Sequence, residues 1–117
     1  MHEMGIAMEI VRIAIESIPA EIDSCRVERV NLRIGKLSAV VPDSLKFCFE
    51  VAAKDTPVEG AALAIEEIPV LAMCKACGHE WTITGPVFTC SQCDSGKIEV
   101  ISGRELDIKS IEINEED

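Results

Sequence analysis

Four of the six cysteines form two closely spaced pairs that could bind one metal ion. The pairs are Cys74-Lys75-Ala76-Cys77 and Cys90-Ser91-Gln92-Cys93, separated by twelve residues. Two CxxC turns let four sulfurs surround a single ion, and Zn²⁺ suits four thiolates because it has no redox chemistry and accepts tetrahedral geometry. Four protein ligands leave no position for water, so the spacing predicts a structural zinc site rather than a catalytic one. A rubredoxin-like iron site uses the same ligands and stays open as an alternative.

Residues near these pairs have weaker claims to a role at the metal. His79, two positions after Cys77, could replace a cysteine if acid weakened a thiolate. Closed four-ligand sites rarely take a fifth ligand, so we interpret His79 as an exposed residue. Trp81, Val87 and Phe88 are expected to fill a small core around the metal. Cys25 and Cys48 are expected to be structural, with Cys48 packed as a small apolar side chain.

A second candidate site lies at Met1-His2-Glu3. A helix is predicted to begin almost at once, so these residues adjoin an ordered element. His2 can combine its imidazole with the backbone amide nitrogens of His2 and Glu3 and, if Met1 is unblocked, with the terminal amine. Such planar nitrogen sets suit Ni(II) or Cu(II) rather than tetrahedral zinc. The alternatives are a solvated chain end for His2 and, for Glu3, an acidic residue that complements the helix start.

The charge balance limits the classes of partner. Eleven basic residues face 21 acidic ones, which gives a net charge of −10. A nucleic-acid binder needs a basic patch to neutralise phosphates, so DNA, RNA and anionic membrane surfaces are disfavoured as partners. The sequence has no secretory leader pattern and no run near the roughly 18 apolar residues that span a bilayer. We therefore expect a cytoplasmic protein without a membrane span, whose thiols stay reduced.

Two helices are predicted from apolar periodicity. Residues 3–18 carry apolar side chains at helical spacing, and Pro19 ends the segment. The expected buried stripe is Met4, Met8, Val11, Ile15 and Ile18, widened by Ile6, Ile10 and Ile13. Residues 42–53 form the second helix, with Pro42 in its first turn and Asp43 at its positive end. Its expected buried stripe is Leu45, Cys48, Phe49 and Ala52. So wide an apolar face on the first helix should pack against a sheet.

Three strands accompany these helices. Residues 27–34 alternate apolar and polar side chains, which predicts one covered and one solvated face, and Gly35 closes the strand. Residues 61–68 form a second strand, and residues 104–113 a third, with a bulge or a change of buried face near Ser110. A two-stranded sheet alone is marginal, so the third strand should return to pair with the first two. The predicted α+β fold thus carries a metal module, residues 70–102, inserted before its last strand.

The chain resembles the HypA/HybF family of hydrogenase maturation nickel chaperones over essentially its whole length. The resemblance rests on Met1-His2-Glu3, the strand ending in Arg33-Ile34-Gly35-Lys36-Leu37, and the helix from Pro42 to Glu50. It continues through Leu63–Pro69, the two CxxC pairs and Ser102-Gly103-Arg104-Glu105-Leu106. The cysteine pairs alone are generic, but their combination with the N-terminal triplet and the Ser-Gly-Arg-Glu-Leu segment is specific.

The resemblance implies two helices packed on a three-stranded sheet, with an inserted zinc-ribbon module. The implied domains are a nickel-binding one, residues 1–69 plus 103–117, and a zinc-binding one, residues 70–102. It implies that His2 binds nickel with help from Glu3, and that Cys74, Cys77, Cys90 and Cys93 bind structural zinc. It also implies delivery of Ni(II) to the precursor of the [NiFe] hydrogenase large subunit, together with a nickel-insertion GTPase, and no enzymatic activity. Some members also serve urease.

Two hypotheses from different classes follow. The first is a nickel metallochaperone for [NiFe] hydrogenase. The second is a zinc-ribbon protein–protein interaction module without nickel delivery. Nickel binding that depends on His2 discriminates between them.

Overall fold

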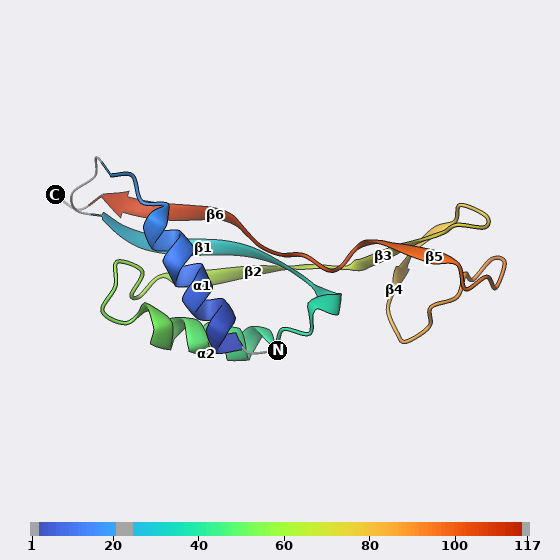
Figure 1. Cartoon of the computed structure of the whole chain (residues 1–117), viewed down its shortest axis with the longest axis horizontal. Helices are drawn as coiled ribbons and strands as arrows, with labels where there is room; N and C mark the ends of the chain where they lie inside the picture. The colour runs from blue at the N-terminus through green and yellow to red at the C-terminus, as the bar shows by residue number, and fades with distance from the viewer. Residues whose placement is uncertain (1–2, 21–24, 116–117) are drawn as a thin grey trace. The chain divides into compact units, whose positions relative to one another are not determined.

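The structure is a computed structural model that describes residues 3–20 and 25–115. The elements, in chain order, are α1 (Glu3–Glu16), β1 (Cys25–Gly35), a short 3-10 turn (Lys36–Ser38), α2 (Pro42–Ala53), β2 (Ala62–Ile68), β3 (Val70–Cys74), β4 (Glu80–Ile83), β5 (Ile98–Ser102) and β6 (Leu106–Glu115). Figure 1 follows them from blue to red. The predicted helix at 42–53 is confirmed at both ends, while the helix predicted to reach residue 18 ends at Glu16.

These elements form two compact units. The helix–sheet unit takes its described residues from the ranges 1–33, 39–66 and 107–117, and the cysteine unit comprises residues 34–38 and 67–106. The cysteine unit therefore contains the whole predicted module, residues 70–102, and a few residues on either side of it. It also includes the segment 34–38, which lies far from the module in sequence.

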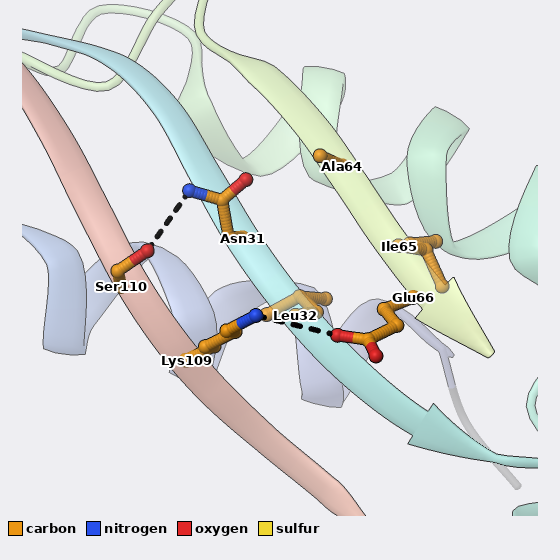
Figure 2. Close-up of a pocket in the computed structure, with 7 residues that line it drawn as sticks. All are labelled: Asn31, Leu32, Ala64, Ile65, Glu66, Lys109 and Ser110. Carbon is orange, nitrogen blue, oxygen red and sulfur yellow. Dashed lines mark hydrogen bonds and ion pairs between the residues drawn. The ribbon is translucent and has the colours of Figure 1, made fainter. Parts of the chain in front are cut away.

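The first sheet has the strand order β2-β1-β6. The last strand of the chain thus pairs with the first, as predicted, although the whole metal module separates β2 from β6 in sequence. Both helices lie behind one face of this sheet in Figure 2, and α1 packs on α2. The α+β fold of two helices on a three-stranded sheet is confirmed.

The stripe predicted to bury α1 is largely wrong. The buried side chains of α1 are Ala7, Ile10, Val11 and Ala14. Met8 is 60% exposed, and Met4 and Ile15 are each 37% exposed. Ala7 and Ala14 are small, so α1 can approach α2 closely on this face. The larger side chains of α1 then lie at the edge of the contact. Within the described part of the chain, neither helix is long and apolar enough to cross a membrane.

Helix α2 supplies two of the largest fully buried side chains, Phe49 and Leu45. Leu45, Phe49 and Ala53 are buried, whereas Cys48 is only half-buried. Pro42 occupies the first turn, where its missing N–H costs nothing, and Asp43 lies beside the positive end of the helix. Strand β1 contributes Val30, Leu32 and Ile34 at alternate positions, and all three are buried as predicted.

The first sheet also lines a depression of about 360 Å³, and Figure 2 shows the residues that line it. Lys109 of β6 reaches over β1 to Glu66 of β2, with 3.6 Å between Nζ and Oε1. The amide of Asn31 donates to Ser110 Oγ at 3.0 Å. The charged and amide groups in the depression are thus paired, as expected for the solvated face of a sheet.

Strand β6 changes phase along its length. Arg33 binds Asp107, and Asn31 binds both Ser110 and Glu112, so all three β6 residues meet the same face of β1. In a regular strand, residues 107 and 110 would point to opposite faces because side chains alternate. The contacts therefore indicate an extra residue between them, in agreement with the irregularity predicted near Ser110.

The cysteine unit is built on a second sheet with the order β4-β3-β5. Strand β3 is central and antiparallel to both neighbours, pairing Val70 with Ile83 at one end of β4 and Met73 with Glu80 at the other. Gly35 closes β1 where the backbone comes close to Gly103, since a Cβ at Gly35 would lie 2.0 Å from the Gly103 carbonyl oxygen. Only glycine fits there.

Candidate metal centre

The four paired cysteines converge within the cysteine unit. The Sγ atoms of Cys74 and Cys93 are 3.5 Å apart, and those of Cys77 and Cys90 are 3.6 Å apart. All four sulfurs lie within 4.8 Å of one another. Cys74 and Cys90 are buried, while Cys77 and Cys93 are exposed. One ligand of each pair therefore faces the interior and one faces the surface.

These distances fit a tetrahedral ion better than a disulfide. Sulfurs joined in a disulfide are roughly 2.05 Å apart, far closer than either of these two pairs. A tetrahedron with metal–sulfur bonds of about 2.3 Å has sulfur–sulfur edges of about 3.8 Å. The measured 3.5 and 3.6 Å approach that edge length. The residues present therefore fit a closed four-thiolate metal site.

The two CxxC turns share one backbone pattern. After each pair, the next residue donates its N–H to the carbonyl of the first cysteine: Gly78 to Cys74 at 2.8 Å, and Asp94 to Cys90 at 2.9 Å. Each first cysteine also donates its own N–H to the carbonyl five residues on: Cys74 to His79 at 2.8 Å, and Cys90 to Ser95 at 2.9 Å. The loops thus close in the same way, which places the four sulfurs about one point.

The residue after each pair has a left-handed backbone. Gly78 has φ of 80° and Asp94 has φ of 58°. Glycine enters this region without a steric cost, and aspartate tolerates it better than most other residues. The conformation turns the chain so that following N–H groups face the sulfurs. The two loops therefore reach one geometry with different residues, Gly78 at no strain and Asp94 at some.

Backbone N–H groups stabilise thiolate charge at the buried end of the cluster. Burial raises the pKa of the Cys74 thiol, but the N–H groups of Cys77 and Ala76 and the thiols of Cys93 and Cys77 outweigh it, so the pKa falls to about 7. In the second loop, the N–H of Gln92 lies 3.4 Å from Cys90 Sγ. The cluster thus carries one thiolate readily near neutral pH.

Further ionisation is opposed by the neighbouring sulfurs. At Cys93 the N–H of Ser95 lowers the pKa of the thiol, but the thiols of Cys74, Cys77 and Cys90, together with burial, raise it to about 12. Four negative sulfurs in so small a volume repel one another, and a divalent cation at their centre removes that repulsion. The arrangement is therefore a receptor for a cation.

His79 is not a member of the ligand group among the residues that the structure describes. Its ring stacks on Trp81, with centroids 5.5 Å apart, and its Nε2 lies 3.5 Å from Ser91 Oγ. His79 is half-buried rather than exposed, because the stack covers one face of its ring. The expected packing of Val87 and Phe88 into the module's core is wrong, since both are exposed.

Of the N-terminal pair, His2 lies outside the described residues. Glu3 is the first residue of α1 and is half-buried. Its carboxylate accepts a hydrogen bond from the backbone N–H of Val41, with 3.4 Å between nitrogen and Oε2. The nickel site predicted at His2 and Glu3 stays a prediction.

The sequence did not reveal two groups that the structure adds. Backbone donors around the sulfurs leave no mark on residue type, apart from the glycine and aspartate that follow the cysteine pairs. The Val41 N–H was also missed, because an apolar residue before a helix carries no sign of a partner 38 positions away.

Comparison with known proteins gives a consistent result over nearly the full length. The family model described as "Hydrogenase/urease nickel incorporation, metallochaperone, hypA" matches residues 1–113. A protein of Desulfosudis oleivorans named hydrogenase maturation factor HypA is 61% identical over 115 residues, which cover 98% of this chain and 100% of that protein. One of the same name from Desulfatibacillum aliphaticivorans is 57% identical, covering 97% of this chain and 87% of that protein.

Solved structures agree. The solution structure of the Ni metallochaperone HypA from Helicobacter pylori matches with a TM-score of 0.66 and 25% identity, covering 99% of this chain and 100% of that one. A second HypA solution structure matches with a TM-score of 0.71 and 24% identity, covering 98% of each chain. This second likeness supports the fold alone.

Proposed function

Because the chain belongs to the HypA family of metallochaperones for nickel incorporation, we propose that it delivers Ni(II) for the maturation of [NiFe] hydrogenase. The observation that carries the proposal is the match over residues 1–113, which includes both the N-terminal triplet and the four cysteines. The family consists of maturation factors and metallochaperones, not enzymes. The ion is cargo to be passed on, so binding must be reversible.

The proposed nickel ligands are the His2 imidazole and backbone nitrogens of His2 and Glu3. A planar set of nitrogens suits Ni(II), which favours square-planar coordination by nitrogen. A delivery site must also release its ion, and a few ligands at a chain end release it more readily than a closed cage. Cu(II) binds the same kind of set more tightly, so selectivity must come from metal availability and from partners.

The proposed role of Cys74, Cys77, Cys90 and Cys93 is to bind structural Zn(II). Four thiolates complete a tetrahedral shell and leave no position for a reactive water. Zinc would supply folding free energy to the cysteine unit, because such a site does not exist in the unfolded chain. We assign residues 70–102 as the zinc-binding domain and residues 1–69 plus 103–117 as the nickel-binding domain.

The proposed partners are a nickel-insertion GTPase and the precursor of the hydrogenase large subunit. A net charge of −10 suits basic protein surfaces and disfavours nucleic acid. The proposed location is the cytoplasm, since the precursor would receive nickel while it is still being assembled. The family description also names urease, which is a second possible recipient.

The decisive experiment is a nickel titration of untagged protein beside its His2→Ala variant, with zinc measured in both. We expect one zinc in each protein, and one nickel with a planar Ni(II) absorption band only in the wild type. His79→Ala is the matched control, because His79 is the only other histidine and belongs to the cysteine unit. It should bind nickel like the wild type.

Three outcomes would contradict the proposal. Retained one-to-one nickel binding in His2→Ala would show that the ligands lie elsewhere. One zinc and no specific nickel in the wild type would favour a zinc-ribbon interaction module, since the four-cysteine cluster alone would then account for the metal. Iron in place of zinc would indicate an electron carrier.

A further inference from the structure

The contact between Glu3 and Val41 joins the starts of two helices. Glu3 opens α1, and Val41 immediately precedes α2. Glu3 Oε2 lies 3.4 Å from the Val41 nitrogen. Both residues belong to the helix–sheet unit. The residue that follows His2 in sequence is thereby connected to an element 38 positions away.

The backbone N–H of Val41, at the N-terminus of α2, needs a hydrogen-bond acceptor, and this carboxylate supplies one. The N-cap residue is Val41, whose own apolar side chain makes no capping hydrogen bond. The Val41 carbonyl accepts the N–H of Leu45 at 2.9 Å and so begins the helix, but the Val41 N–H points out of it. A carboxylate near a helix N-terminus is also favoured by the helix dipole. Glu3 therefore acts as a cap supplied by the other helix.

We propose that the Glu3 side chain is a positioning group for nickel rather than a nickel ligand: it binds the Val41 N–H and thereby fixes the backbone beside His2. This inference rests on the proposed function, because it concerns the same site. A planar set of nitrogens needs the Glu3 backbone and not its carboxylate. The carboxylate is thus available to α2.

The expected consequence is tighter nickel binding. A chelate made of consecutive backbone atoms must order those atoms when it closes on the ion, and ordering that is already present is not lost on binding. Holding the first turn of α1 against α2 supplies part of that order. We expect loss of the contact to weaken nickel binding about 3- to 10-fold, the range for a typical intramolecular hydrogen bond.

The first test removes the hydrogen-bond donor. Val41→Pro lacks the backbone N–H, and the native φ of −89° lies near the value that proline requires. The carbonyl that binds Leu45 stays in place. Val41→Ala is the matched control, because it keeps the N–H and trims a side chain that is 55% exposed. Val41→Pro should weaken nickel binding, and Val41→Ala should not.

The second test changes the acceptor. Glu3→Ala removes it, whereas Glu3→Gln keeps an oxygen that can accept the Val41 N–H. We expect Glu3→Ala to match Val41→Pro, and Glu3→Gln to recover most of the wild-type affinity. Glu9→Ala is the control for loss of a carboxylate from α1, since Glu9 pairs with Arg12 on the surface. All variants should keep the wild-type Ni(II) absorption band, because the ligand atoms are unchanged.

A third measurement needs no nickel. Hydrogen exchange at the amides of Ala7 and Met8, which close the first turn of α1, should be faster in Val41→Pro and Glu3→Ala than in their controls. If exchange is faster in these two variants but the wild-type protein does not bind nickel, the contact is supported and the proposed function is rejected.

Two results would overturn the inference. Nickel affinity and exchange in Val41→Pro that equal those of Val41→Ala would show that the contact holds nothing in place. A shifted absorption band in Glu3→Ala or Glu3→Gln would show that the carboxylate is itself a ligand.

Discussion

The two units of this protein differ in the side chains that form their cores. The buried apolar side chains of the helix–sheet unit come from α1, β1, α2 and the loop after α2, and include Phe49, Leu45 and Leu32. In the cysteine unit the buried set is Ile34, Val70, Ala72, Cys74 and Cys90. Two of these five are metal-site cysteines. The first unit has an apolar core of its own, and we infer that the second depends on a metal at its sulfur cluster for stability.

Charge separates the units further. The helix–sheet unit carries 7 Lys and Arg against 16 Asp and Glu, a net of −9, and the cysteine unit carries 4 against 5, a net of −1. The acidic character of the chain thus lies almost wholly in the unit with the proposed nickel site.

The largest expected effect is the loss of the cysteine unit when its metal is removed. Cys74→Ser deletes a sulfur that is 1% exposed. Structural zinc contributes roughly 10–16 kcal/mol of apparent binding free energy in small zinc-finger peptides at neutral pH, so losing a ligand should unfold the strands around it. Hydrogen exchange should show loss of protection in β3, β4 and β5, with α1 and α2 unchanged. Zinc content should fall in parallel.

Cys48→Ser is the control for this change, since Cys48 is a half-buried thiol outside the cluster. It should keep one zinc and normal exchange. Unfolding of α1 and α2 together with the strands would contradict the comparison, because it would show that the two units share one folding transition.

The reciprocal change removes the largest side chain from the other core. Phe49 is 2% exposed, and Phe49→Ala should cost about 3–5 kcal/mol by loss of buried area and creation of a cavity. We expect a lower unfolding midpoint for the helix–sheet unit and an unchanged zinc stoichiometry. Phe47→Ala, at a side chain that is 65% exposed on the same helix, is the control and should change stability little. Loss of zinc from Phe49→Ala would show that the cysteine unit depends on the core of the helix–sheet unit for its stability.

This difference also explains what could be predicted from the sequence. The cysteine spacing identified the metal cluster, because four ligands for one ion must be residues of a few types at short intervals. The alternation of Val30, Leu32 and Ile34 identified the covered face of β1, because a strand has a strict period of two. The return of β6 to β1 followed from the instability of a lone two-stranded sheet.

The remaining features depend on which neighbour a residue meets. The stripe through Met4 and Met8 is as apolar as the true face through Ala7 and Ala14, and only the approach of α2 selects between them. Trp81 has a stacking partner in His79, while Val87 and Phe88 have none among the described residues that buries them. The sequence does not tell which apolar side chains become buried, because the hydrophobic effect favours burial but is non-directional.

A smaller effect is expected within the cysteine unit, where the two metal loops differ at one position. Asp94→Gly should stabilise the zinc-bound unit by up to about 1 kcal/mol, because glycine adopts the left-handed backbone without strain. Gly78→Ala should cost about 1 kcal/mol for the opposite reason, although a Cβ there meets open space. Zinc competition with a chelator would measure both. Equal effects of the same sign would refute this account of the loops.

The smallest expected effect concerns the pairing of β1 with β6 in the helix–sheet unit. Arg33 donates Nε and Nη2 to the two carboxylate oxygens of Asp107 at 3.0 and 2.9 Å. These hydrogen bonds hold the pKa of the Asp107 carboxyl below its ordinary value of 3.8.

A carboxyl whose pKa is lowered by folding stabilises the fold above its unfolded pKa, and this contribution is lost as the pH falls through the folded pKa. Arg33→Gln should therefore raise the pKa of Asp107 toward 3.8 and reduce the stability that is lost as the pH falls below about 4. An NMR titration of the carboxyl carbons measures this, with Arg29→Gln as the control, because Arg29 pairs with Glu112 instead. If the pKa of Asp107 stays low in Arg33→Gln, another group causes the shift, and the Arg33–Asp107 pair does not stabilise the pairing of β1 with β6.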